Sequence, residues 1–272
     1  MRRVVGDGVT LTVLDEGQGR PVLLLHGFPD SSRLWRDQIP ALVDVGMRAI
    51  APDLRGFGES DKPEAVGDYA IPRSVADMIA VLDELEIDRA HVVGHDFGAA
   101  LAWALAALAP ARVDRLVAMS VGHPALLRER SIEQREKSWY TLLFQFEGVA
   151  EALLARDDWR LFREWLRDDG DIERYVADLA RPGALTAALN WYRANLAPHL
   201  DLEPRPPVPA VAAPTLGLWS TGDHYLLEDR MVRSGELVTG PWRYERIDGA
   251  SHWMQLDAPE RVNELLLDFL AE

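Results

Sequence analysis

Nearly continuous apolar runs recur along the chain, at residues 21–25, 89–94, 115–121 and 214–219. Strands buried on both faces of a parallel sheet have this composition, whereas strands with one face in water alternate between apolar and polar residues. Between and after these runs lie segments rich in helix-forming residues, namely 74–85, 99–108 and 259–269. The alternation of the two patterns predicts an α/β fold with a mostly parallel central sheet flanked by helices.

The pattern changes between residues 123 and 202, where strand-like runs disappear. The segment is helical in character and richer in charge and in aromatic residues, including Trp139, Trp159, Trp165 and Trp191. A cluster of prolines, Pro204, Pro206, Pro207 and Pro209, then forms a stiff connection to the last strands. We therefore expect a first core part at residues 1–122, an inserted helical cap at 123–206, and a second core part at 207–272.

The composition of the chain indicates which binding partners and which cellular location to expect. The chain has 272 residues, is 48% hydrophobic, and carries 29 Lys and Arg against 44 Asp and Glu, a net charge of −15. Such a charge disfavours nucleic acid and anionic membrane as partners. Cysteine is absent, which excludes disulfides, thiolate metal sites and a cysteine nucleophile. With neither a signal peptide nor a bilayer-spanning run, a cytoplasmic protein is expected.

Residues 94–98 read Gly-His-Asp-Phe-Gly, which resembles the nucleophile elbow G-x-S-x-G of the α/β-hydrolases with Asp96 in place of serine. The string lies between a predicted strand and a predicted helix, as the motif requires. A surface turn with a solvated Asp96 is the alternative interpretation. A serine that attacked an sp3 carbon would form an ether that water cannot open, whereas a carboxylate forms an ester that it can. Asp96 therefore indicates a strained or halogenated alkyl substrate.

A second motif, His-Gly-Phe-Pro at residues 26–29, ends the first buried run. In α/β-hydrolases the third residue of this loop supplies one N–H of the oxyanion hole, and the residue after the nucleophile supplies the other. The resemblance assigns these roles to Phe28 and Phe97 and implies a cis Phe28–Pro29 bond. His26 is expected to be structural, with a catalytic base as the alternative.

The base is predicted to be His252, which lies in a loop between a short strand and the last helix. The acid that orients it should follow the preceding strand, where Asp223 stands. Glu228 and Asp229 are nearby competitors, but they resemble the polar start of a helix. The resulting order of nucleophile, acid and histidine is that of α/β-hydrolases. The other histidines lack such a setting, although His95 adjoins Asp96 and could reach the pocket.

Taken together, these motifs resemble the epoxide hydrolases of the α/β-hydrolase superfamily over nearly the whole chain. That family protonates the epoxide oxygen with two cap tyrosines, and the segments 139–151 and 189–193 resemble those that carry them, with Tyr140 and Tyr192 at the matching positions. A phenol suits this role because it stays protonated at neutral pH and is more acidic than the alkoxide it must protonate. The resemblance implies hydrolysis of a small-molecule epoxide by water to a vicinal diol, without cofactor or metal.

Two positions depart from related families and leave alternatives open. Haloalkane dehalogenases commonly use a tryptophan after the nucleophile and an asparagine in the His-Gly loop to bind halide, and Phe97 and Phe28 stand there. Fluoroacetate dehalogenases usually carry an arginine after the nucleophile, which is also missing. A haloalkane or haloacid dehalogenase with the same Asp96 remains the alternative enzyme, and a catalytically silent ligand-binding protein the alternative of another class. The identity of the epoxide, the regio- and enantiopreference and the oligomeric state stay open.

Overall fold

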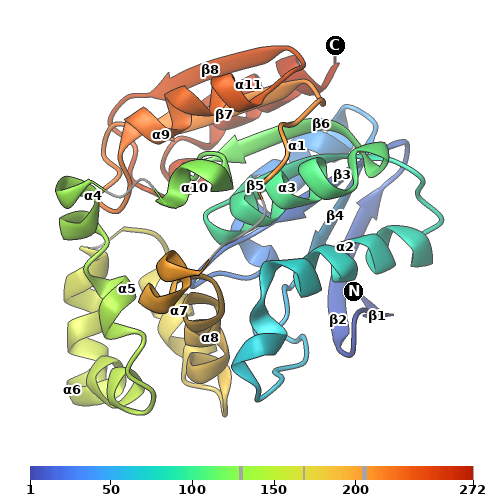
Figure 1. Cartoon of the computed structure of the whole chain (residues 1–272). Helices are drawn as coiled ribbons and strands as arrows, with labels where there is room; N and C mark the ends of the chain where they lie inside the picture. Colours follow the sequence, from blue (N-terminus) through green and yellow to red (C-terminus); the bar gives the residue numbers. More distant parts are fainter. Residues whose placement is uncertain (129–130, 168, 204–206, 272) are drawn as a thin grey trace.

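The computed structural model describes residues 1–128, 131–167, 169–203 and 207–271 (Figure 1). One sheet has the strand order β1-β2-β4-β3-β5-β6-β7-β8. The pairs β1/β2 and β2/β4 are antiparallel, and every other pair is parallel. The strands are β1 (Arg2–Val5), β2 (Thr10–Gly17), β3 (Arg20–Leu25), β4 (Met47–Pro52), β5 (Ala90–His95), β6 (Val113–Met119), β7 (Thr215–Ser220) and β8 (Trp242–Ile247). The predicted α/β architecture is confirmed.

Helices flank this sheet, and those of the core are α1 (Gln38–Asp44), α2 (Ile71–Glu84), α3 (Phe97–Leu108), α9 (Glu228–Arg233), α10 (Met254–Asp257) and α11 (Pro259–Ala271). Helix α1 packs against α11, and α2 packs against α3. Helix α3 is buried almost all round, with only Leu108 exposed, which explains why it consists of alanine, leucine, glycine and two aromatic residues and carries no charge.

The central strands are buried along their whole length, as their apolar runs predicted. Every residue of β5 and β7 is buried, and so are the last four residues of β3 and of β6. In the register of the sheet, Leu25 pairs with Gly94, Gly94 with Ala118, and Ala118 with Gly217. The carboxyl ends of these strands therefore reach the same edge, where ligands bind in open parallel sheets.

The N-terminal hairpin of β1 and β2 was not predicted. Residues 10–13 do alternate between threonine and an apolar residue, the signal of a strand with one buried face. Strand β1 has only one buried residue, Val4, and this leaves too little pattern to identify it from the sequence.

Between β6 and β7 the described residues form helices and contain no strand. These helices are α4 (Ile132–Lys137), α5 (Tyr140–Leu143), α6 (Val149–Leu166), α7 (Ile172–Leu179) and α8 (Ala184–Leu196). Figure 1 shows them, coloured green to brown, gathered beyond one edge of the sheet. Helix α6 is interrupted at 156–159, where the backbone is not helical. The expected end of the cap at residue 206, together with Pro204 and Pro206, lies outside the described residues.

Polar contacts join these helices to the core. The guanidinium of Arg174 lies 2.5 Å from the buried carboxylate of Asp30, and the Tyr175 hydroxyl donates to the same carboxylate at 2.8 Å. The indole of Trp191 donates to the carbonyl of Arg55 at 3.0 Å. Because Asp30 follows the loop of Phe28, the first contact ties α7 directly to the edge where the sequence motifs meet.

Candidate active site

Three predicted side chains meet at the carboxyl edge of the sheet. Asp96 follows β5, Asp223 follows β7, and His252 follows β8. The Nδ1 atom of His252 is 2.7 Å from Oδ2 of Asp223, and its Nε2 atom is 3.7 Å from Oδ2 of Asp96. One imidazole therefore lies between two carboxylates, in the arrangement of an orienting acid, a base and a nucleophile.

The elbow at Asp96 has the strained geometry that the motif predicts. Asp96 has φ 53° and ψ −123°, a backbone conformation that residues with a Cβ rarely adopt. A Cβ on Gly94 would lie 2.2 Å from the carbonyl oxygen of Gly98, and one on Gly98 would lie 2.0 Å from the carbonyl oxygen of Leu25. The turn is thus packed so closely that only glycine fits at either side of it.

Phe28 and Phe97 offer backbone N–H groups to Asp96. The N–H of Phe28 donates to Oδ1 of Asp96 at 2.9 Å. A Cβ on Gly27 would lie 2.3 Å from the same oxygen, so glycine is needed there for the close approach. The expected cis bond between Phe28 and Pro29 is present. Oδ1 therefore already occupies an oxyanion-type site, whereas Oδ2 is directed toward His252.

His26 has a structural place, as expected. Its Nε2 accepts from the N–H of Leu54 at 3.0 Å, and its Nδ1 lies 2.9 Å from the carbonyl of Gly27. The ring is fully buried, and burial lowers its pKa. Both ring nitrogens of His26 are thus engaged in holding the loop rather than in reaching Asp96.

The charges of the three groups stabilise one another. Burial lowers the pKa of His252, but the Asp223 carboxylate, followed by Asp96, outweighs it and raises the pKa to about 10. Burial likewise raises the pKa of Asp96, yet the hydrogen bond and charge of His252, with the Phe97 N–H, hold it below its ordinary value. The site at neutral pH therefore contains an imidazolium between two carboxylates.

The competing acids are placed elsewhere. Glu228 accepts a hydrogen bond from the Tyr244 hydroxyl at 2.5 Å, and Asp229 is exposed at the start of α9. Asp223 is 3% exposed, and its Oδ1 accepts from the N–H groups of residues 225 and 226 at 2.8 and 2.9 Å. Those two bonds fix the carboxylate with Oδ2 toward His252.

Tyr140 and Tyr192 face one cavity together with Asp96. Tyr140 begins α5, Tyr192 lies in α8, and their rings meet edge to face with centroids 5.9 Å apart. Both line a cavity of about 70 Å³ that also contains Asp96 and Phe97. Burial, with Tyr140 and Asp96 nearby, raises the pKa of Tyr192 well above its usual range. Tyr192 therefore stays a proton donor at every physiological pH.

The comparisons with known proteins agree with this geometry. A sequence model of the α/β-hydrolase fold family matches residues 20–259. Epoxide hydrolase A of Mycobacterium tuberculosis is 36% identical over 317 aligned positions, which cover 99% of this chain and 96% of that protein. The chain belongs to the epoxide hydrolases of the α/β-hydrolase family.

Solved structures of this family match the whole chain of the hydrolase. The crystal structure of epoxide hydrolase A from Mycobacterium thermoresistibile has a TM-score of 0.81 at 33% identity and covers 99% of this chain and 97% of that one. The Bacillus megaterium epoxide hydrolase in complex with an inhibitor has a TM-score of 0.90 at 28% identity, with 100% of both chains covered.

Sequence reasoning missed the two side chains that bind the main-chain carbonyl of His252. His95 Nε2 lies 2.9 Å from the carbonyl oxygen of His252, and Ser120 Oγ donates to the same oxygen at 3.3 Å. Burial lowers the pKa of His95 to about 3, so its ring is neutral and Nε2 carries the proton that it donates. The sequence placed His95 beside Asp96 but gave no sign that its ring turns toward the C-terminal loop.

A third tyrosine, Tyr225, was also missed. Its ring lies 5.2 Å from that of His252 and 5.9 Å from that of Tyr140, and its hydroxyl donates to the carbonyl of Trp165 at 3.3 Å. Tyr225 thus contacts both the ring of His252 and the cap tyrosine Tyr140. In the sequence, only its position two residues after Asp223 could have indicated that it lies near the site.

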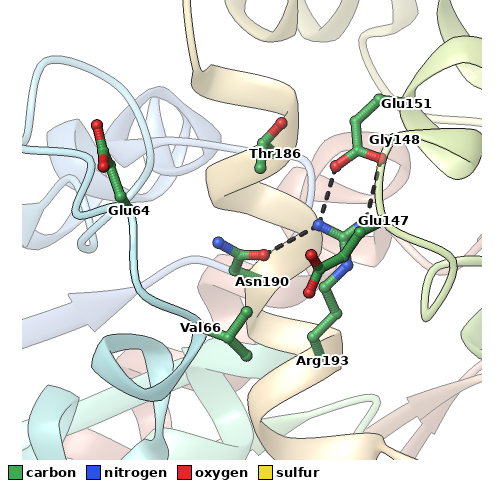
Figure 2. Close-up of a pocket in the computed structure, with 8 residues that line it drawn as sticks. All are labelled: Glu64, Val66, Glu147, Gly148, Glu151, Thr186, Asn190 and Arg193. Carbon is green, nitrogen blue, oxygen red and sulfur yellow. Dashed lines mark hydrogen bonds and ion pairs between the residues drawn. The ribbon is translucent and has the colours of Figure 1, made fainter.

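A larger cleft, of about 280 Å³, lies on another side of α8 and does not contain Asp96 (Figure 2). Its lining residues are Glu64, Val66, Glu147, Gly148, Glu151, Thr186, Asn190 and Arg193. Figure 2 shows the guanidinium of Arg193 turned toward Glu151, with bonds of 2.9 and 3.0 Å, and toward Asn190, at 3.0 Å. Its Nε also donates to the carbonyl of Phe144 at 2.9 Å. Arg193 therefore links α8 to the end of α5 and to the first turn of α6, and the ring of Phe144, whose carbonyl it binds, contacts both tyrosines.

Two further findings concern the described part of the chain only. It holds no group of three or more acidic, histidine or cysteine side chains placed to bind a metal ion. None of its helices combines the length and the apolar composition that crossing a bilayer requires.

Proposed function

We propose that this enzyme hydrolyses a small-molecule epoxide to a vicinal diol through a covalent ester on Asp96, with water as the second reactant. The observation that carries the proposal is the position of the Asp96 carboxylate, with Oδ1 held by the Phe28 N–H at 2.9 Å and the two cap tyrosines lining the same cavity. A nucleophile and two proton donors that line one small space suit an electrophile whose carbon and leaving oxygen are neighbours. We further propose residues 123–206 as a cap unit that supplies these donors.

In the first step, Oδ2 of Asp96 forms a bond to an epoxide carbon while the bond between that carbon and the ring oxygen breaks. The hydroxyls of Tyr140 and Tyr192 donate hydrogen bonds to the departing oxygen, and one of them transfers its proton. The products of this step are a hydroxyalkyl ester and a tyrosinate, which regains its proton from solvent. Such a preorganised pair of donors acts where charge develops in the transition state.

In the second step, a water molecule attacks the carbonyl carbon of the ester and gives its proton to His252, which Asp223 holds in the required tautomer. The oxyanion forms on Oδ1, where the N–H groups of Phe28 and Phe97 stabilise it. The bond between the carbonyl carbon and Oδ2 then breaks, and the diol leaves with Oδ2 and takes a proton from His252. The second proton of the water passes from the new carboxyl group of Asp96 to His252, which restores the starting state. Asp96 has thereby gained one oxygen from water.

Ester formation also prepares the base. In the free enzyme, two carboxylates raise the pKa of His252 to about 10. The ester removes the negative charge of Asp96, so the pKa of His252 falls, and the ring can lose its proton before it activates water. The first step thus converts an imidazolium that stabilises the nucleophile into a neutral base.

The alternatives lack a comparable observation. Halide departure needs donors in place of Phe28 and Phe97, whose benzyl side chains have no N–H or O–H to offer. A silent binding protein would have no need of the strained Asp96 backbone or of the bond of 2.7 Å between His252 and Asp223.

The test is a single turnover with excess enzyme in water enriched in ¹⁸O, using an epoxide that the enzyme converts. Because the diol takes its new oxygen from Asp96, the first diol should be unlabelled, and the peptide that contains Asp96 should gain one ¹⁸O. Mass spectrometry of both products measures this. A labelled first diol beside an unlabelled peptide would mean that water attacks the epoxide directly and that Asp96 is only a general base.

A further inference from the structure

Two buried histidines contact each other beside the proposed nucleophile. His95 is the last residue of β5, and His252 follows β8. Their ring centroids lie 4.6 Å apart, with the ring planes at 55°, and the two residues are 0% and 3% exposed. The proposed mechanism uses His252 as the base and gives His95 no part. A buried titratable ring therefore packs against the base without a role in the chemistry described so far.

A hydrogen bond joins the His95 ring to the main chain of the base. Its Nε2 atom lies 2.9 Å from the carbonyl oxygen of His252. Burial, followed by the charge of His252, lowers the pKa of His95 to about 3, so the ring is neutral. Because a carbonyl oxygen only accepts hydrogen bonds, the single N–H of the neutral ring is on Nε2. His95 is therefore an uncharged donor to the residue that carries the proposed base.

The second ring nitrogen of His95 indicates that packing alone does not explain this residue. Its Nδ1 atom is buried and has no hydrogen-bond partner in the described part of the chain. A buried polar atom without a partner carries a free-energy cost that an apolar side chain of the same size avoids. The benefit of a histidine at this position is thus the bond from Nε2 to the carbonyl of His252.

The carbonyl of His252 is bound from two neighbouring strands. His95 pairs in the sheet with Met119, the last residue of β6. The next residue, Ser120, donates from its Oγ to the same carbonyl at 3.3 Å, and it has φ 67°, which is uncommon for a residue with a Cβ. The centre of the sheet thus binds the main chain of His252, whereas Asp223 binds its ring at 2.7 Å.

From this geometry we infer that His95 is a positioning residue for the second step, whose uncharged N–H fixes the main chain of His252 and thereby the place of its Nε2 near Asp96. Ester hydrolysis requires the base, a water molecule and the ester carbon to align, and an error of 1 Å in such an alignment costs about 10²-fold in rate. Ring opening uses the charge of His252 but needs no alignment with water, so it should depend less on His95. The inference rests on the proposed function.

The lack of charge on His95 suits this role. A cation 4.6 Å from the ring of His252 would repel the imidazolium of the free enzyme and lower its pKa. A lysine or arginine at position 95 would thus donate a hydrogen bond but weaken the positive charge that stabilises Asp96. A neutral donor fixes the place of the base without reducing that charge.

Two variants separate the hydrogen bond from the space that the ring fills. His95→Met keeps an apolar side chain of similar length without a donor, and His95→Gln keeps an uncharged N–H donor near the Nε2 position. In His95→Met we expect the rate constant of ester hydrolysis to fall roughly 10- to 100-fold, with ring opening nearly unchanged. Since kcat/KM reports the steps through ring opening, kcat and KM should fall together at constant kcat/KM. His95→Gln should regain most of the hydrolysis rate.

Quenched single turnovers with an epoxide that the wild-type enzyme converts, 1,2-epoxyhexane first, give both rate constants by mass spectrometry of the ester. His91→Met is the matched control, because His91 is also a fully buried histidine of β5 but has its Nδ1 3.4 Å from Asp114. This control should leave both rate constants unchanged. If His95→Met does not fold, His95→Asn replaces it, since its shorter amide reaches the Nδ1 position and not the carbonyl of His252.

Three results would overturn the inference: an ester that the donor-free variant hydrolyses at the wild-type rate, equal slowing of both steps, or a His95→Gln variant as slow as His95→Met. Failure of the proposed function gives a different result. Without an ester on Asp96, no variant would show the mass of protein plus one substrate, and kcat and kcat/KM of His95→Met would fall together.

Discussion

The two halves of the site are held in different ways. In the core, Asp96, Asp223 and His252 stand at strand ends, and main-chain groups fix them through the strained elbow, the N–H of Phe28 and the amides that bind Asp223. In the cap, Tyr140 and Tyr192 lie on separate helices, and side chains hold them through ring contacts and the guanidinium of Arg193.

This difference predicts that the two proposed steps depend on different parts of the protein. In the proposed mechanism, ring opening needs both halves, because the proposed nucleophile is in the core and the proposed proton donors are in the cap. Ester hydrolysis needs only the core, where the proposed base, its acid and the oxyanion N–H groups are found. Changes in the cap should therefore affect ester formation alone, and changes at His252 should affect ester hydrolysis.

The largest effect should come from removing both phenols. Each of Tyr140→Phe and Tyr192→Phe should cost about 2 to 4 kcal/mol in the ring-opening step, by analogy with the loss of one oxyanion donor, and the double variant should be nearly inactive. Quenched single-turnover measurement of ester formation gives the rate. Tyr244→Phe, which changes a tyrosine of β8 that binds Glu228, is the control. Substantial turnover by the double variant would remove the cap from the chemistry.

The next largest effect should appear in His252→Gln, on the other half of the site. Without the base, hydrolysis of the ester should slow by roughly 10²- to 10⁴-fold, while alkylation of Asp96 still takes place. Intact-protein mass spectrometry should show the protein plus one substrate, mapped to the peptide of Asp96. Protein that stays unmodified with a confirmed substrate would argue against two separate steps.

A smaller effect is expected from Arg193→Lys, since lysine cannot bind Glu151 in bidentate fashion and the carbonyl of Phe144 at once. Misplacement of the tyrosines should slow ester formation roughly tenfold, because positioning errors well below 1 Å already reduce rates. Hydrolysis of the preformed ester should not change. Arg163→Lys, which alters an exposed ion pair with Glu173, is the matched control. Equal slowing of both steps would mean that Arg193 serves the fold in general rather than the tyrosine pair.

The smallest effect concerns pH. The pKa of His252 is raised to about 10, above its unfolded value of about 6.5, so the protonated ring stabilises the fold fully below pH ~6.5 and this contribution is lost as pH rises toward 10. Asp96→Asn removes one of the two charges and should lower the pKa. NMR titration of the His252 ring measures the pKa, and chemical unfolding at several pH values measures the stability. Equal pKa values of His252 in the two proteins would show that the Asp96 charge does not raise the pKa of this ring.

Much of the core half was predictable from the sequence because its signals are local. A buried strand must end before a turn, and the glycines at 94 and 98 identify a turn with no room for a side chain, so Asp96 could be assigned from five residues. Phe28 could likewise be placed from its motif, and Asp223 and His252 could be placed because each follows a predicted strand. For Tyr140 and Tyr192 no local signal exists beyond resemblance, because an aromatic residue on a helix has the same pattern whether it lines a cavity or fills a core.

The sequence by itself determined the order of elements, the buried strands and the chemical type of the proposed nucleophile, since these depend on the composition of short segments and on the reactivity of one side chain. Only the tertiary structure decided which groups that are far apart in the sequence contact one another. His95 reaches the carbonyl of His252, Arg193 joins three cap helices, and Phe28 packs against Phe144 of the cap. These contacts result from how a parallel sheet aligns its strand ends and how the cap packs over them, and their energies depend on distances that no stretch of sequence specifies alone.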